Sequence, residues 1–309
     1  MGASIQRMLT EAELEAAIER GARQLSPALA SEYEAAGPGA LDPLERHALL
    51  LGYFRHGPCA NVDAVVLHLS ALIGLRPECA CLALGWVSRE SHPMHHSRVA
   101  ASWRSAVDKS SNTSALLNAF HFFELGDEDY AGRLLKRGLA ASPSDSVWHS
   151  AAGSYYLRRG ARNADRTQLL LAHAHYAEAL SLSECEQDSA LGLVAYSALK
   201  AGKPEDARQA ALQAVAGRGP ARGVNQHLGH TVLGMLACER GDLEQAASHL
   251  LASAADVPQS YLSTSGPRLE LAQRLLVTGK SVPVEAFVAK LVSIWPCGAA
   301  RLHAVLDVV

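Results

Sequence analysis

Histidine is the residue type whose number and spacing in this sequence most readily suggest chemistry. The chain carries 14 histidines among 309 residues, and neutral imidazole serves both as a general base and as a metal ligand. His227 and His230 are three residues apart, so one face of a helix would carry both. His249, on the next predicted helix, could complete a three-histidine site. The competing interpretation is that these rings are packed, hydrogen-bonded core residues.

The other histidine clusters give weaker signals for a metal site. His92, His95 and His96 flank Pro93, and His92 shares a helical face with His95 only if the helix begins before the proline. Their segment also lacks a carboxylate in register with the rings. We therefore predict no metal and no cofactor, and keep His227, His230 and His249 as the residues to test for metal binding.

Short catalytic motifs are absent from the sequence. It contains no GxSxG, P-loop, GxGxxG or HExxH pattern. The six cysteines form no CxxC pair, which favours buried reduced thiols over a zinc site or disulfides. A noncontiguous active site leaves no local pattern. An enzyme, or an accessory subunit of one, that uses a histidine site therefore stays open, although we lean against enzymatic activity.

Composition indicates the fold class and restricts the partners. Apolar residues make up 49% of the chain and aromatic residues only 6%, with alanine and leucine dominant, which predicts an all-α protein. The net charge is −3, so no overall basic field would recruit nucleic acid or an anionic membrane. We predict no nucleic-acid partner and no membrane partner.

Three further compositional features bear on source and localisation. No window of 18 apolar residues occurs, and the N-terminus lacks the basic and apolar stretches of a signal peptide. The sequence thus predicts a cytoplasmic protein. Of the 28 basic residues, 22 are arginine and six are lysine, a bias that suggests a GC-rich bacterial genome.

Helix-start signals divide the first 111 residues into several predicted helices. Thr10 and Glu13 form a capping-box pattern, and Asp42 precedes Pro43 at the start of another helix. Residues 25–43 are predicted to form a loop with one turn at most. A helix is also predicted from Pro77 to Arg89, which would make a helix-turn-helix with residues 61–73. It lacks the side chains that read bases, so DNA binding is disfavoured.

A repeat of paired helices begins at about residue 112. Small residues recur at positions 8, 20 and 27 of a unit of about 34 residues, where two helices pack closely. The four predicted units begin at Asn112, Asp145, Asp188 and His227. The small residues are Ala119, Ala131 and Gly138 in the first unit, Ala152, Ala172 and Ala179 in the second, Ala195, Ala207 and Ala214 in the third, and Gly234 and Ala246 in the fourth. Residues 158–166 are predicted as an insertion in the second unit.

This pattern resembles the tetratricopeptide repeat (TPR) superfamily over about half of the chain. The resemblance implies a right-handed α-solenoid of TPR-like helix pairs with a concave groove. We expect an N-terminal helical region over residues 1–111, TPR-like repeats over residues 112–258 and C-terminal capping helices over residues 259–309. The last part also resembles the ending of some bacterial repeat proteins of unassigned activity.

The groove that the resemblance implies is apolar and aromatic, with no lysine or arginine. Carried over by repeat position, its predicted partner-binding residues are Leu116, Phe120, Phe123, His149, Tyr156, Tyr196, Thr231 and Met235. The sequence therefore predicts an interaction module, or scaffold, that holds a peptide or helix with an apolar segment. Two alternatives are the histidine-based enzyme and a peptide-responsive regulator. The C-terminal helices could also fold back and fill the groove themselves.

Overall fold

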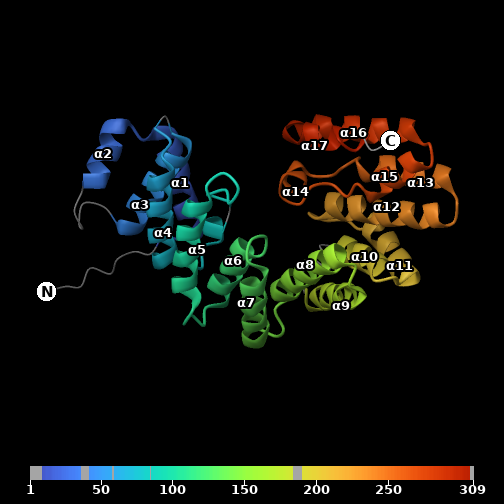
Figure 1. Ribbon diagram of the computed structural model, residues 1–309, viewed down its shortest axis with the longest axis horizontal. Coiled ribbons are helices and arrows are strands. Elements are labelled where there is room, and N and C mark those ends of the chain that lie inside the picture. Colours follow the sequence, from blue (N-terminus) through green and yellow to red (C-terminus); the bar gives the residue numbers. More distant parts are fainter. Residues whose placement is uncertain (1–8, 36–41, 58, 84, 184–189, 307–309) are drawn as a thin grey trace. The chain divides into compact units, whose positions relative to one another are not determined.

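The protein is an all-α solenoid built from pairs of helices (Figure 1). The computed structural model describes residues 9–35, 42–57, 59–83, 85–183 and 190–306. Helices occupy 77% of the chain, and the described ranges contain no strand, which confirms the predicted fold class. Within the same ranges, no helix combines the length and hydropathy that a membrane span requires.

The chain forms two compact units, each with its own buried residues. Unit 1 comprises residues 1–143 and unit 2 comprises residues 144–309, so the first predicted repeat lies in unit 1 and the other three lie in unit 2. The helices of unit 1 are α1 (Glu11–Gln24), α2 (Pro27–Ala35), α3 (Pro43–His56), α4 (Val62–Leu75), the 3-10 helix η1 (Ala80–Ala83), α5 (Pro93–Val107), α6 (Thr113–Phe123) and α7 (Glu128–Ala141).

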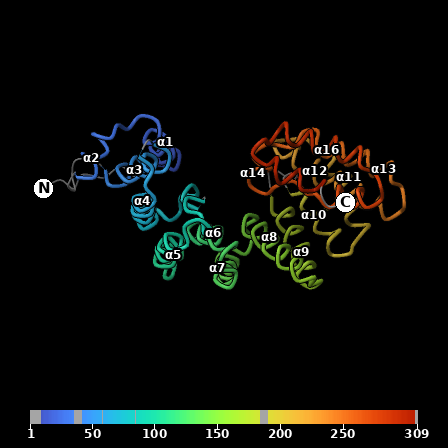
Figure 2. The backbone as a smooth tube through the Cα atoms, turned by 45° about the horizontal axis from the view of Figure 1, so that its top comes forward, coloured from blue at the N-terminus to red at the C-terminus, as the bar shows by residue number. Residues whose placement is uncertain are grey.

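Unit 2 continues the same helix-pair arrangement. Its helices are α8 (Ser146–Asn163), α9 (Arg166–Leu182), α10 (Leu191–Lys200), α11 (Pro204–Ala216), α12 (Arg222–Glu239), α13 (Leu243–Ser253), α14 (Gln259–Thr264), α15 (Glu270–Val277), α16 (Ser281–Ile294), η2 (Pro296–Gly298) and α17 (Ala299–His303). Neighbours along the chain pack on one another, as α8 does on α9 and α12 on α13. Figure 2 shows the same pairs as a continuous tube.

Local signals explain where the helices begin. Thr10 accepts the Glu13 N–H while the Glu13 carboxylate accepts the Thr10 N–H, which confirms the predicted capping box. Asp42 caps α3, and Asp242 caps α13. Gly241, at φ +80°, supplies the left-handed turn between α12 and α13 that a side chain would strain.

Small residues lie where the paired helices are closest. Ala131 in α7 and Ala207 in α11 are completely buried, as the repeat positions predict. We expect Ala131→Leu or Ala207→Leu to lower the free energy of unfolding by roughly 1–3 kcal/mol, because extra methyl groups force packed helices apart. Urea unfolding of each variant checks this. Wild-type stability at both sites would contradict the assignment of these residues to close helix contacts.

Two N-terminal segments differ from the sequence-based expectation. Residues 27–35 form helix α2 rather than a single turn. The helix predicted from Pro77 to Arg89 is wrong, since η1 is the only helical stretch among the described residues of that segment. Two side chains, one from α6 and one from the segment itself, donate to carbonyl groups that a longer helix would need internally. The Asn118 amide donates to the Pro77 carbonyl at 3.0 Å, and the Trp86 indole donates to the Cys81 carbonyl at 2.8 Å.

The structure can also be compared with the predicted insertion and with the predicted starts of the third and fourth units. Residues 158–166 lengthen α8 and α9, which are 18 and 17 residues long, instead of forming a separate loop. Ala164 closes α8 in the left-handed conformation, and Asp165 caps α9. The predicted start of the third unit, Asp188, lies outside the described residues. Helix α12 begins at Arg222, five residues before the predicted start of the fourth unit.

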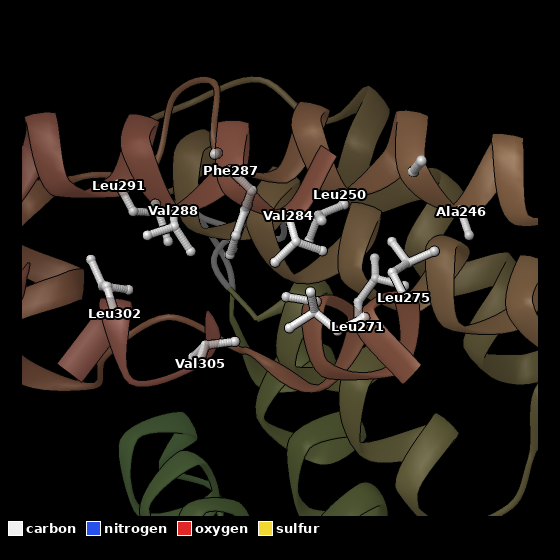
Figure 3. Close-up of a cluster of buried hydrophobic side chains, with 14 of the residues drawn as sticks. Ala246, Leu250, Leu271, Leu275, Val284, Phe287, Val288, Leu291, Leu302 and Val305 are labelled. Carbon is white, nitrogen blue, oxygen red and sulfur yellow. The ribbon is translucent and has the colours of Figure 1, made fainter. Parts of the chain in front are cut away.

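The C-terminal helices complete the core of unit 2. Leu250 of α13 packs in one buried cluster with Leu271 and Leu275 of α15 and with Phe287 of α16 (Figure 3). Leu302, near the end of the described chain, joins the same cluster. These helices therefore cover an apolar face of the last predicted repeat.

Candidate functional site

A hollow in unit 1 is the candidate site. It lies between α5, residues 85–90 and the turn from α6 to α7, and has two parts, of 500 and 740 Å³, that share Arg89, His96 and Gly126. We call it the unit-1 hollow. Its lining is completed by Ala83, Gly85, Val87, Ser88, Glu90, Ser97, Ala100, Arg104, His121, Phe122, Phe123, Leu125, Asp127, Glu128 and Asp129.

The larger part of the hollow has an apolar wall. The ring of His96 stacks on that of Phe122, with centroids 4.8 Å apart and an angle of 14° between the planes. Burial lowers the pKa of His96, with Arg89 acting in the same direction, so the ring is neutral at pH 7. Leu125 stands beside this stack with 76% of its surface exposed. The wall therefore offers aromatic and aliphatic surface that faces solvent.

Arg89 lines both parts of the unit-1 hollow. Its guanidinium Nη1 donates to the Gly126 carbonyl at 2.8 Å. A Cβ atom at position 126 would lie 3.2 Å from that nitrogen, so glycine allows the guanidinium to approach closely. The repeat pattern gives no signal for Arg89, which lies before the first predicted unit.

The smaller part of the hollow is polar and mainly acidic. Arg104 pairs with Asp127 at 2.8 Å and lies 5.0 Å from the centre of the Phe123 ring. Burial alone would raise the pKa of Asp127, but the Tyr130 N–H and the Arg104 guanidinium outweigh it and lower that pKa. Around the whole hollow, four carboxylates (Glu90, Asp127, Glu128 and Asp129) exceed the two guanidiniums in number.

The predicted groove residues fall into two groups by exposure. His149, Tyr156 and Met235 are partly exposed. The structure buries the other five, with at most 4% of the surface exposed: Leu116, Phe120, Phe123, Tyr196 and Thr231. Phe123 is covered by Arg104 and by the Tyr130 ring, 4.6 Å away between centroids. These five side chains pack within their own units and present little surface to a partner.

Tyr196 is buried because residues after α14 cover it. The Tyr196 hydroxyl donates to the Glu270 carboxylate, which also pairs with Lys200 at 3.3 Å. The guanidinium of Arg268 lies 4.7 Å from the centre of the Tyr196 ring. Burial would raise the pKa of Glu270, but the Tyr196 hydroxyl and Lys200 outweigh it and lower that pKa. The C-terminal part of unit 2 thus occupies this stretch of the predicted groove.

His227 serves structure rather than chemistry. It is completely buried, its Nδ1 faces the Ser253 carbonyl at 2.9 Å, and its Nε2 accepts the Arg268 N–H at 3.0 Å. Because Nε2 is the acceptor, Nδ1 carries the proton. Both nitrogens are therefore used by the backbone. The predicted set of three metal candidates is divided, since His230 and His249 pair with each other instead.

A different group of potential metal ligands occurs in unit 1. Among the described residues, Glu11, Glu15 and Cys81 place one ligand atom each within 4.8 Å of one another. Burial raises the pKa of the Cys81 thiol to about 12, so this sulfur stays protonated in the metal-free protein. The cluster has no further feature that points to a metal ion.

Comparisons with known proteins assign this chain to no family. No protein-family profile matches the sequence. No curated protein matches it either. Among solved structures, the chain is similar to one described as "Human IFIT1 dimer with PPP-AAAA", with a TM-score of 0.49 and 15% identity, over 91% of this chain and 69% of that one.

The similar structure corrects one prediction. We expected no nucleic-acid partner, from the net charge and from the absence of lysine and arginine in the predicted groove. That expectation is contradicted by the structure named above, which is described as a dimer with PPP-AAAA. Net charge averages over a whole chain, so it is a poor guide to the field at one site.

Proposed function

We propose that this chain is a helical-repeat interaction protein whose unit-1 hollow binds a segment of a partner protein. The observation that carries the proposal is Leu125, which is 76% exposed beside the His96–Phe122 stack. A large apolar side chain held in the open at a hollow is typical of a contact surface. The 740 Å³ of the larger part would accommodate one or two apolar side chains of a partner.

The charges around the hollow favour a basic partner segment. Arg104 is engaged by Asp127, and Arg89 by a backbone carbonyl, whereas Glu90 and Asp129 are exposed carboxylates of the lining. Opposite charges across an interface orient the partner and speed association. The proposed partner segment therefore has a leucine, methionine or phenylalanine that contacts Phe122 and Leu125, with lysine or arginine nearby.

Selection from a displayed library of random peptides tests this proposal with the full chain. We expect the enriched peptides to combine a large apolar residue with a neighbouring lysine or arginine. Leu125→Asp should weaken their binding at least tenfold, a loss of about 1.4 kcal/mol. Leu212→Asp is the matched control, because Leu212 is 49% exposed on α11 of unit 2 and should leave binding unchanged.

Two outcomes would contradict the proposal. In the first, no peptide is enriched relative to a control selection without the protein. In the second, the selected peptides bind the wild type and the Leu125→Asp variant equally. A triphosphorylated RNA oligonucleotide is titrated in parallel. If RNA binds and Leu125→Asp abolishes that binding while no peptide is enriched, the hollow is an RNA site and the partner proposed here is wrong.

A further inference from the structure

Three histidine pairs each join the two helices of one hairpin. His47 of α3 faces His68 of α4, with 2.9 Å between their Nδ1 atoms. Two further pairs have the same arrangement: His149 of α8 faces His175 of α9 at 3.1 Å, and His230 of α12 faces His249 of α13 at 3.0 Å. We call these three pairs the histidine clasps. All six rings are buried or partly buried.

In each clasp the two Nδ1 atoms lie close to the line that joins the two ring centroids. The ring centroids are 5.2, 5.2 and 5.3 Å apart, which is about 2.2 Å more than the Nδ1 separations. That difference is about twice the radius of an imidazole ring, so the two nitrogens point directly at each other. Nitrogens that share one tetrahedral or octahedral metal ion would instead be angled toward a common point. The atom between them is therefore a proton in an N–H···N hydrogen bond.

A hydrogen bond of this kind limits how many protons the pair can hold. One Nδ1 must carry a proton and the other must offer its lone pair. If both rings become imidazolium, both Nδ1 atoms are donors, the bond is lost and two positive charges face each other at about 3 Å. Each clasp thus accepts at most one extra proton without breaking.

The first clasp shows which ring resists protonation most. Nε2 of His68 is buried and has no hydrogen-bond partner. A proton placed there would be an unsatisfied buried donor, so His68 keeps its proton on Nδ1 and donates to His47. Burial, reinforced by His47 and Arg46, lowers the pKa of His68 to about 4.

Aromatic rings cover two of the clasps in the same way. Phe54, seven residues after His47, stacks on His68 at 5.8 Å and 8°. Tyr156, seven residues after His149, stacks on His175 at 5.4 Å and 12°. Seven residues is two helical turns, so each aromatic ring lies on the same helix face as the first histidine. In these two clasps the second histidine ring therefore stacks on an aromatic ring from the helix that carries the first histidine.

The charged groups that act on the clasps differ from pair to pair. Arg46 acts on the first clasp and Arg240 on the third, and both oppose a second positive charge. In the second clasp burial lowers the pKa of His175, with His149 acting in the same direction, and Glu178, on the same helix as His175, partly opposes them. Burial lowers the pKa of His230 to about 4, with His249 acting in the same direction.

We infer that the histidine clasps are acid-operated latches, which hold the α3–α4, α8–α9 and α12–α13 hairpins closed at neutral pH and release them in acid. Histidines whose folded pKa lies below the unfolded value of 6.5 stabilise the fold above pH 6.5, and this contribution is lost as the pH falls toward 4. The first and third clasps should release fully only near the lower end of that range. The second should respond to smaller acidification because of Glu178.

Native-state hydrogen exchange of α13 in the full chain tests the latch. After correction for the intrinsic exchange rate, the opening equilibrium of residues 243–253 should rise at least tenfold between pH 7.5 and pH 4.5. The double variant His230→Leu and His249→Leu keeps apolar bulk but cannot titrate, so its opening should change less than twofold. His303→Leu, which removes an exposed histidine of α17, should behave as wild type.

The same response to pH in the wild type and in the double variant would overturn the inference. Should the double variant fail to fold, imidazole N–H signals in the wild-type NMR spectrum decide the matter. Clasp protons held between two nitrogens should be visible at pH 7.5 and lost below pH 4. Their absence at pH 7.5, or their persistence well below pH 4, would refute the latch.

Discussion

Gly52→Ala should reduce the free energy of unfolding of unit 1 by about 3 kcal/mol or more. Helices α1 and α3 cross backbone against backbone, and a Cβ atom at position 52 would lie 1.9 Å from the Ile18 carbonyl oxygen. Gly21 has the reciprocal contact, since its Cβ atom would lie 1.9 Å from the Leu49 carbonyl oxygen. No side-chain rotation relieves a clash with backbone, so the helices must separate. Urea unfolding followed by circular dichroism measures the loss.

Gly74→Ala is the matched control for that substitution. Gly74 is exposed within α4, and an added Cβ atom would meet no other atom within 4 Å. Alanine there should stabilise the protein by about 0.5–1 kcal/mol, through the higher helix propensity of alanine. The two Gly→Ala changes should therefore have opposite signs. A Gly52→Ala variant as stable as the wild type would show that α1 and α3 are not in close contact.

Tyr196→Ala should destabilise unit 2 by about 3–5 kcal/mol, the usual effect of removing a buried aromatic side chain. Tyr196 is only 4% exposed, packs under Arg268 and donates to Glu270. Removing the ring leaves a cavity and deprives Arg268 of the aromatic face that it covers. Thermal and urea unfolding of the full chain measure the change.

Two companion variants separate packing from hydrogen bonding. Tyr196→Phe keeps the ring but removes the hydroxyl donor to Glu270, so it should cost about 1–2 kcal/mol. Val277→Ala, at a side chain that is 78% exposed, should have almost no effect. If Tyr196→Ala is as stable as the wild type and instead loses affinity for a peptide, Tyr196 belongs to an open groove and the burial described above is wrong.

Features that depend on a few neighbouring residues could be predicted from the sequence. The Thr10–Glu13 capping box, the Asp42 cap and the Gly241 turn each arise from side-chain and backbone chemistry within one helical turn. The small residues at repeat positions, such as Ala131 and Ala207, also lie where the pattern requires. The helix-pair fold could be predicted from the sequence because many such local signals indicate the same fold.

Features that depend on distant contacts could not be predicted. Tyr196 is buried by Glu270, which lies 74 residues further along the chain. The segment from Pro77 to Arg89 has residues suited to a helix. However, the side-chain amide of Asn118, 41 positions after Pro77, donates a hydrogen bond to the Pro77 carbonyl. Arg89, which lines both parts of the unit-1 hollow, belongs to no repeat position. The candidate site therefore came from geometry, whereas the repeat pattern identified only one of its lining residues, Phe123.

The shared core of α13 with α15 and α16 has a consequence for synthesis of the protein. Leu250 belongs to one buried cluster with Phe287 and with residues as far along as Leu302 and Val305. A ribosome that adds about 5–20 residues per second needs roughly 3–10 s to pass from Leu250 to Val305. For that time the apolar face of α13 is uncovered on the nascent chain, where a chaperone can bind it. A ribosome that stalls within α15 leaves that face uncovered for longer, which makes such products prone to aggregation.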